Sequence, residues 1–197
     1  RRLQEETARE EQALSGLQSR LRVLQEMAKS REGYYASVRS VLKDAERDKG
    51  LKEAIVGVVA ELIRVPKAYE TAVTMALGSS LQNIVTPTAE AAQYVIEYLR
   101  KNEYGRATLL PMALLNPGRI NSGERELLAM PGVIGVASEL VEYDGRVKTA
   151  VEYLLGRTVI VRDLNSGVAL KKRSRGAFHI ATLEGDIIST GGSMSGG

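Results

Sequence analysis

The sequence predicts an α+β protein in which a long N-terminal helix precedes two related subdomains, each built from a small sheet and helices. Three observations support this class. Apolar residues recur about every 3.5 positions through a charged N-terminal stretch. A 22-residue pattern occurs twice in the remainder, and strand-like and helix-like runs alternate within each copy. The 197 residues, 44% of them hydrophobic, are enough for one body with an extended part.

Residues 1–47 predict the long helix, because they contain no proline and place apolar side chains on one heptad seam. Thr7, Glu10 and Arg31 interrupt this seam. Such a pattern is typical of one strand of a coiled coil, and it would reach roughly 70 Å if fully helical. The alternative is an amphipathic helix that lies on its own domain. The seam positions are Leu3, Leu14, Leu17, Leu21, Leu24, Ala28, Tyr35, Val38, Leu42 and Ala45.

An internal repeat follows the arm. Residues 57–78 align without gaps on residues 135–156, always 78 positions apart, and nine of the 22 pairs are identical. A repeat that occurs only twice at this spacing predicts two related subdomains rather than a solenoid.

Each copy predicts the same order of elements. A strand near 57–63 or 135–141 leads to a helix near 66–77 or 145–155. A glycine after each of these helices predicts a left-handed end, at Gly78 and Gly156. Thr88 and Asp163 are the expected N-caps of the second helices, "AEAAQYVIEYLRKN" and "LNSGVALKKR". The strand-like runs are "LQNIVT", "RATLLP", "TVIVRD" and "AFHIATLE", and "LEGDIIS" predicts a turn between two final strands.

Catalytic motifs are absent. The terminal segment "GGSMSGG" (191–197) has no lysine and no following helix, so it is neither a P-loop nor a dinucleotide fingerprint. His179, the sole histidine, lies in an apolar run and is expected to be a strand residue. Glu184 and Asp186 flank a glycine, which turn chemistry explains without a cation. By composition, "GGSMSGG" is a flexible linker or a surface that another backbone approaches closely.

Two basic clusters are candidates for DNA contact. Basic and acidic residues nearly balance over the chain, 27 against 24, so any nucleic-acid site depends on local clustering. Both clusters end a predicted helix, where the helix dipole also favours cations. The candidate residues are Arg100, Lys101, Lys171, Lys172, Arg173 and Arg175.

Four blocks of the sequence closely resemble the hinge domain of structural maintenance of chromosomes (SMC) proteins, of the bacterial chromosome-partition type. They lie in the family's order from about Gly33 to Gly197. The blocks are "EGYYASVRSVLKDAE", "GVVAELIRVPKAYETAVTMALGSSLQNIVT", "YGRATLLPM" and "ATLEGDIISTGGSMSGG".

The resemblance implies a homodimerisation module that joins two coiled-coil arms into a V or ring holding DNA. The expected boundaries are an arm over 1–47, subdomains over 48–116 and 125–197, and a connection over 117–124. The implied dimer interface uses the terminal glycine motif and the strand before it. Its residues are Ile187, Ile188, Gly191, Gly192, Ser193, Gly196 and Gly197.

The resemblance also implies the partners. They are a second copy of the chain, DNA bound weakly with a preference for single strands, and the returning coiled-coil helix of the full-length protein. We expect no cofactor and no enzymatic activity in this piece, although the parent is expected to be an ATPase. No long apolar run indicates a membrane span, and the resemblance implies a cytoplasmic, nucleoid-associated location. The alternatives are a DNA-binding module whose dimerisation is secondary, and a small-molecule or catalytic domain.

Overall fold

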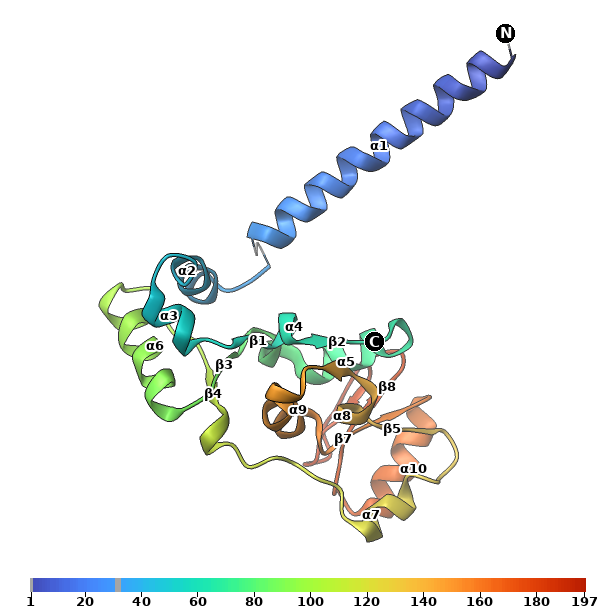
Figure 1. Cartoon of the computed structure of the whole chain (residues 1–197). Helices are drawn as coiled ribbons and strands as arrows, with labels where there is room; N and C mark the ends of the chain where they lie inside the picture. Colours follow the sequence, from blue (N-terminus) through green and yellow to red (C-terminus); the bar gives the residue numbers. More distant parts are fainter. Residues whose placement is uncertain (1, 31–32) are drawn as a thin grey trace.

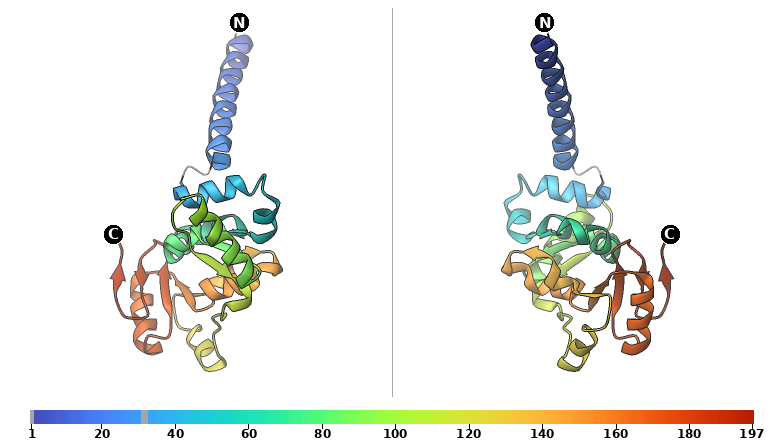
Figure 2. Two further views of the ribbon diagram at one scale, coloured as in Figure 1. Left: turned by 90° about the vertical axis from the view of Figure 1, so that its left-hand side faces the viewer. Right: turned by 90° about the vertical axis from the view of Figure 1, so that its right-hand side faces the viewer.

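The computed structural model describes residues 2–30 and 33–197 (Figure 1). Helix α1 (Arg2–Ser30) projects from a folded body as a rod (Figure 2). Its described side chains, residues 3–26, are all exposed. The seam leucines are among them, and Leu14 and Leu21 retain more than half of their accessible surface. The predicted seam position Ala28 lies outside the residues whose side chains are described.

The helical arm is shorter than the predicted span of 1–47. Residues 33–35 are not helical, and a separate helix α2 (Ala36–Asp44) follows. The side chains of Val38, Val41 and Leu42 are buried in the core of the body rather than exposed on a seam. The heptad pattern did not separate the two cases, because apolar positions three and four apart suit a coiled coil and a surface helix equally. Helix α3 (Lys49–Ala54) completes this N-terminal cap.

The two copies of the repeat fold alike, and the one-turn and main helices of each begin and end 78 residues apart. Each expected first strand is split by one helical turn, because "VAEL" and "ASEL" favour helix. The first copy contains β1 (Gly57–Val58), α4 (Val59–Leu62), β2 (Ile63–Arg64), α5 (Glu70–Leu77), β3 (Ile84–Thr86), α6 (Ala89–Lys101) and β4 (Leu109–Pro111). The second contains β5 (Val133–Val136), α8 (Ala137–Leu140), β6 (Glu142–Tyr143), α9 (Lys148–Leu155), β7 (Thr158–Val161), α10 (Leu164–Ser174) and β8 (His179–Thr182).

The sheets repeat the same pairing. In the first, β3 lies between antiparallel β1 and parallel β4; in the second, β7 lies between antiparallel β5 and parallel β8. The second sheet then continues through β9 (Ile187–Ile188) and β10 (Met194–Ser195), which are antiparallel additions. A two-stranded ribbon of β2 and β6 joins the copies, with Ile63 opposite Tyr143.

The two copies share a hydrophobic core and therefore pack as one body. One buried cluster draws residues from both, including Val73 and Leu77 of α5 and Val151 and Leu155 of α9. Each copy also has its own cluster, between its sheet and its second helix, α6 or α10.

The expected caps are present. The hydroxyl of Thr88 accepts from the Ala91 amide at 3.1 Å, and the carboxylate of Asp163 accepts from the Ser166 amide at 2.8 Å. Neither glycine has the expected left-handed helical conformation. Gly78 has a positive φ of 52° but a ψ of −129°, and Gly156 has a φ of −66°. Glycine is needed there for space, since a Cβ would collide with the Gly118 carbonyl of the connecting segment.

The connection between the copies is partly helical. Helix α7 (Ser122–Leu127) begins inside the predicted connecting segment, with a capping box between Asn121 and Glu124. No helix in the described part of the chain is long and apolar enough to cross a membrane.

Candidate functional site

The terminal glycine segment forms the second strand of a hairpin at the edge of the second sheet. Strand β10 pairs with β9, with Met194 opposite Ile188 and Ser195 opposite Ile187. Figure 2 shows this strand at the outer side of the body. Every residue from 191 to 197 is exposed, so the segment offers backbone to the surroundings as an ordered edge.

The turn of this hairpin is closed by its own serines. The Ser189 amide donates to the Ser193 carbonyl at 2.9 Å, and the Gly192 amide donates to the Ser189 carbonyl at 3.0 Å. The hydroxyls of Ser189 and Ser193 lie 2.7 Å apart, and the Ser193 amide donates to the Ser189 hydroxyl at 3.1 Å. Ser193, an expected interface residue, is therefore also a structural residue of the turn.

The fold of the single chain requires glycine at some of the four glycine positions of this segment and not at others. Gly192 and Gly197 have φ values of 95° and 109°, which favour glycine. A Cβ on Gly196 would collide with the Asp186 carboxylate. Gly191 has neither constraint, since a Cβ there would have the Ser189 hydroxyl, 3.9 Å away, as its nearest neighbour. The fold thus explains three of the glycines, whereas no dihedral angle or close contact within the chain requires a glycine at position 191.

The two isoleucines expected at the interface point inward. Ile188 is 2% exposed and belongs to the core cluster of the second copy. Ile187 is half-buried against the shared core. Strand β9 is paired on both sides, so the hairpin presents the free backbone edge of β10 and exposed side chains that include Met194, which is 53% exposed.

The basic clusters lie on separate helices at opposite ends of the body. Arg100 and Lys101 end α6, whereas Lys171, Lys172 and Arg173 end α10 (Figure 1). The structure therefore does not bring the two clusters together within one chain.

The members of the α10 cluster are not equivalent. The ammonium of Lys171 donates to the carbonyls of Ser189 and Thr190, each at 2.7 Å. Lys172, Arg173 and Arg175 are exposed, and Arg175 ends the helix with a left-handed φ of 53°.

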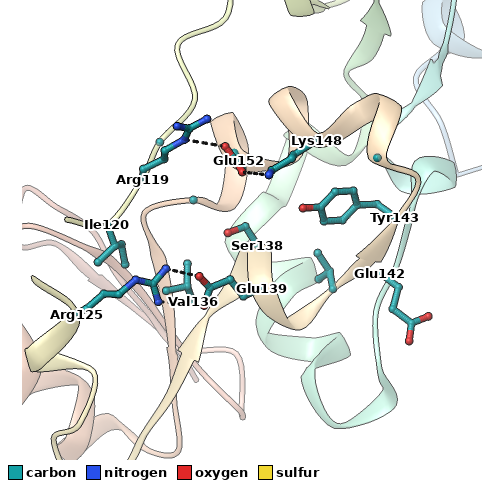
Figure 3. A pocket seen from close by; sticks show the side chains of 14 residues that line it. Arg119, Ile120, Arg125, Val136, Ser138, Glu139, Glu142, Tyr143, Lys148 and Glu152 are labelled. Carbon is teal, nitrogen blue, oxygen red and sulfur yellow. Dashed lines mark hydrogen bonds and ion pairs between the residues drawn. The ribbon is translucent and has the colours of Figure 1, made fainter. Parts of the chain in front are cut away.

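A groove of about 800 Å³ runs along the second copy, between the connecting segment and helices α8 and α9 (Figure 3). Most of its charges are paired: Glu152 accepts from Arg119 at 3.2 Å and lies 3.6 Å from the Lys148 ammonium. Arg125 pairs with Glu139. With Glu142, the lining holds three acidic and three basic side chains, so no excess charge of one sign selects an ionic ligand.

Sequence reasoning missed this groove because its walls come from segments that are far apart in the chain. The described residues hold no cluster of three metal-ligating side chains. Asp186, considered for a cation, instead accepts from the Thr182 hydroxyl at 3.1 Å across its turn. His179 lies in β8 as expected, and burial, with a smaller effect of the Lys171 charge, lowers its pKa below the ordinary 6.5.

Comparison with known proteins agrees with this architecture. A family model described as "SMC proteins Flexible Hinge Domain" matches residues 52–171. The chromosome partition protein Smc of Halothermothrix orenii is 40% identical over 179 residues, which are 91% of this chain and 15% of that protein. The corresponding protein of Bacillus subtilis is 39% identical over 176 residues, 89% of this chain and 14% of that protein.

Solved structures give the same result. The crystal structure of an asymmetric dimer of the Geobacillus stearothermophilus SMC hinge domain matches with a TM-score of 0.85 and 38% identity. The match covers 94% of this chain and 75% of that chain. The present chain spans only about 15% of the length of the curated relatives that it matches.

Proposed function

The chain belongs to the family of SMC hinge domains, and from this premise we propose that it is a homodimerisation module of a chromosome-partition protein. The relatives of known structure include a hinge crystallised as a dimer. We propose further that two copies meet through two equivalent contacts, each joining the first copy of the repeat in one protomer to the second copy in its partner. A two-fold axis generates this contact twice and closes a ring.

The observation that carries the proposal is a difference between the two otherwise matching sheets. In the second copy, β8 is followed by the β9–β10 hairpin. In the first copy, the counterpart of β8 is β4, and β4 is the last described strand of its sheet. Each protomer thus ends one sheet at β4 and the other at β10. Pairing β10 of one protomer with β4 of its partner would complete both sheets and satisfy backbone groups that are otherwise left to water.

The glycine segment suits such a contact. Gly191 is exposed and has no role inside the chain, which a close approach by the partner's backbone would explain. The exposed Met194 would supply apolar surface to the same contact. We propose that the interface set acts through backbone and glycine positions, while Ile187 and Ile188 anchor β9 in the cores on the two faces of the sheet.

The arm and the parent protein extend the proposal. The exposed leucines of α1 require a second helix, which we assign to the returning helix of the full-length protein. We propose that the parent is an ATPase that uses the dimer to join its arms around DNA in the cytoplasm, and that this piece has a structural role without a cofactor. The alternative, a DNA-binding module whose dimerisation is secondary, predicts that the oligomeric state depends on DNA.

Analytical ultracentrifugation over a concentration series tests the dimer. We expect wild-type protein to be dimeric at low micromolar concentration without DNA. Gly191→Leu should weaken the dimer at least about tenfold, because the added side chain holds two backbones apart without straining the hairpin. Replacing all four glycines by alanine should give monomers. Gly145→Leu is the matched control for Gly191→Leu, since a Cβ on that exposed glycine meets no atom within 4 Å.

Two results would contradict the proposal. One is a dimer that persists in the quadruple glycine variant. The other is a wild-type protein that remains monomeric until DNA is added, which would favour the alternative.

A further inference from the structure

The β9–β10 hairpin needs support from outside its own strands. Each strand has two residues, and hairpins of this size are marginal in water. Its turn is exposed, and the serine hydrogen bonds that close it compete with solvent. If this hairpin forms the dimer contact, its shape before contact affects the affinity, because ordering it on binding would cost free energy.

Lys171 supplies that support from helix α10. Its ammonium donates to two successive carbonyls, of Ser189 and Thr190, at the point where the chain leaves β9 for the glycine segment. A lysine ammonium has three donors, and a contact to two adjacent carbonyls holds the turn in one orientation. Charged donors also form stronger hydrogen bonds than neutral ones.

The surrounding backbone leaves room for this contact. Gly176, just beyond the end of α10, has a φ of 82°. A Cβ at this position would lie 3.1 Å from the Thr190 carbonyl oxygen and 3.3 Å from the Lys171 ammonium. Beneath them, Gly167 lets α10 approach β9, with a Cβ position 3.2 Å from a methyl carbon of Ile188. Helix, lysine and hairpin therefore form one packed unit.

The internal repeat gives an independent comparison. Lys171 lies eight residues after the N-cap Asp163 of α10, and the residue eight positions after the N-cap Thr88 of α6 is Ile96. The first copy has no hairpin after β4 among its described strands, and Ile96 is exposed there. A lysine thus occupies this helix position in the copy that carries a hairpin, and an apolar residue occupies it in the other.

We propose that Lys171 is the positioning residue of the dimerisation hairpin. Its ammonium holds the Ser189–Thr190 turn so that β10 is presented as an edge for the partner. The effect on dimerisation rests on the proposed function. The contact between Lys171 and the hairpin does not, because it lies within one chain. It also separates Lys171 from Lys172, Arg173 and Arg175, whose charges remain exposed to solvent.

Amide hydrogen exchange tests the hairpin directly. It is measured at Gly192 and Ser193, at a concentration where the protein is monomeric, for Lys171→Met and for the neighbouring control Lys172→Met. The methionine keeps most of the stem and removes the charged donor. Exchange at both amides should rise about tenfold in Lys171→Met and stay within about twofold of wild type in Lys172→Met. Lys171→Arg should restore part of the protection, because a guanidinium still donates to carbonyls.

The dimer dissociation constant is then measured for the same variants. It should rise about tenfold in Lys171→Met and remain unchanged in Lys172→Met. Unchanged exchange in Lys171→Met would overturn the positioning role, even if the wild-type protein dimerises. Faster exchange with an unchanged dissociation constant would also overturn it, by showing that hairpin order does not govern the dimer. A different result would contradict the proposed function, namely that the wild-type protein does not dimerise.

Discussion

Asp44 joins the base of the arm to the body through side-chain hydrogen bonds. At the end of α2, its carboxylate accepts from the hydroxyl of Tyr98 on α6 at 2.8 Å. It also accepts from the hydroxyl of Tyr104, just before β4, at 2.6 Å. These bonds lower the pKa of Asp44 below 3.8, with the Tyr104 bond as the largest cause. One carboxylate therefore connects three segments.

The same bonds predict sensitivity to alkaline pH. The hydrogen bond to Asp44 is the main cause that raises the pKa of Tyr98 to about 12, and it also raises that of Tyr104 above 10.0. Because the folded pKa values exceed the unfolded value, the stabilisation is fully present below pH 10 and is lost as the pH rises through the folded values. Urea unfolding should show this loss in wild type and a smaller loss in Tyr98→Phe.

Asp44→Asn and Tyr153→Phe complete this test. Asp44→Asn should lower the free energy of unfolding by roughly 1 kcal/mol at neutral pH and weaken the alkaline loss. Tyr153→Phe changes an exposed tyrosine and should match wild type. An alkaline profile that is identical in wild type, Tyr98→Phe and Asp44→Asn would show that these hydrogen bonds do not stabilise the fold.

At the scale of elements, the connecting segment is held by a clamp centred on Arg157. Its guanidinium donates to both carboxylate oxygens of Glu124, at 2.9 and 3.0 Å, and to the carbonyls of Arg119 and Ala177, each at 2.8 Å. It also lies 5.7 Å from the centre of the Phe178 ring. The clamp therefore fixes the connection, α7 and the start of β8 relative to one another.

Gly156 tests whether this close packing matters. Gly156→Ala should lower the free energy of unfolding by about 1–3 kcal/mol, because the new methyl group collides with the Gly118 carbonyl and displaces the connection. Chemical denaturation measures the change. Gly145→Ala, which meets nothing within 4 Å, should stay within about 0.5 kcal/mol of wild type. Equal stability of the two variants would mean that the connection moves away at no cost.

At the scale of the whole molecule, the two basic clusters at opposite ends of the body are the proposed DNA contacts. Dimerisation would double both sites, and each would neutralise only a few phosphates. We therefore expect weak binding of a single-stranded oligonucleotide that falls roughly tenfold or more between 50 and 200 mM salt. Fluorescence anisotropy of a labelled oligonucleotide measures this dependence.

Two charge-reversal variants locate the contact. One changes Lys172, Arg173 and Arg175 to glutamate and spares Lys171, which is bonded to the hairpin; the other changes Arg100 and Lys101. At least one should weaken binding without altering the dimer, and Arg146→Glu is a control on an exposed cation elsewhere. An affinity for the oligonucleotide that is independent of salt, or that is unchanged in both charge-reversal variants, would exclude these clusters as the DNA site.

Much of the candidate site and fold was predictable because its signals are local. The repeat identified two matching copies, the caps Thr88 and Asp163 located their second helices, and the glycine at 185 marked the turn before β9. The caps and the turn depend on residues a few positions apart, and the repeat is a comparison within the sequence itself, so the sequence alone contains this information.

Tertiary structure decided what depends on distant neighbours. A heptad seam does not reveal that Val38 and Leu42 meet a core instead of a second helix. A glycine at the end of a helix does not reveal that the carbonyl of Gly118, 38 positions earlier, lies against it. A run of basic residues does not reveal that Lys171 reaches the hairpin while its neighbours face solvent. Capping and periodicity act within a few residues, whereas burial, close approach and hydrogen bonds across the chain arise only when the elements pack.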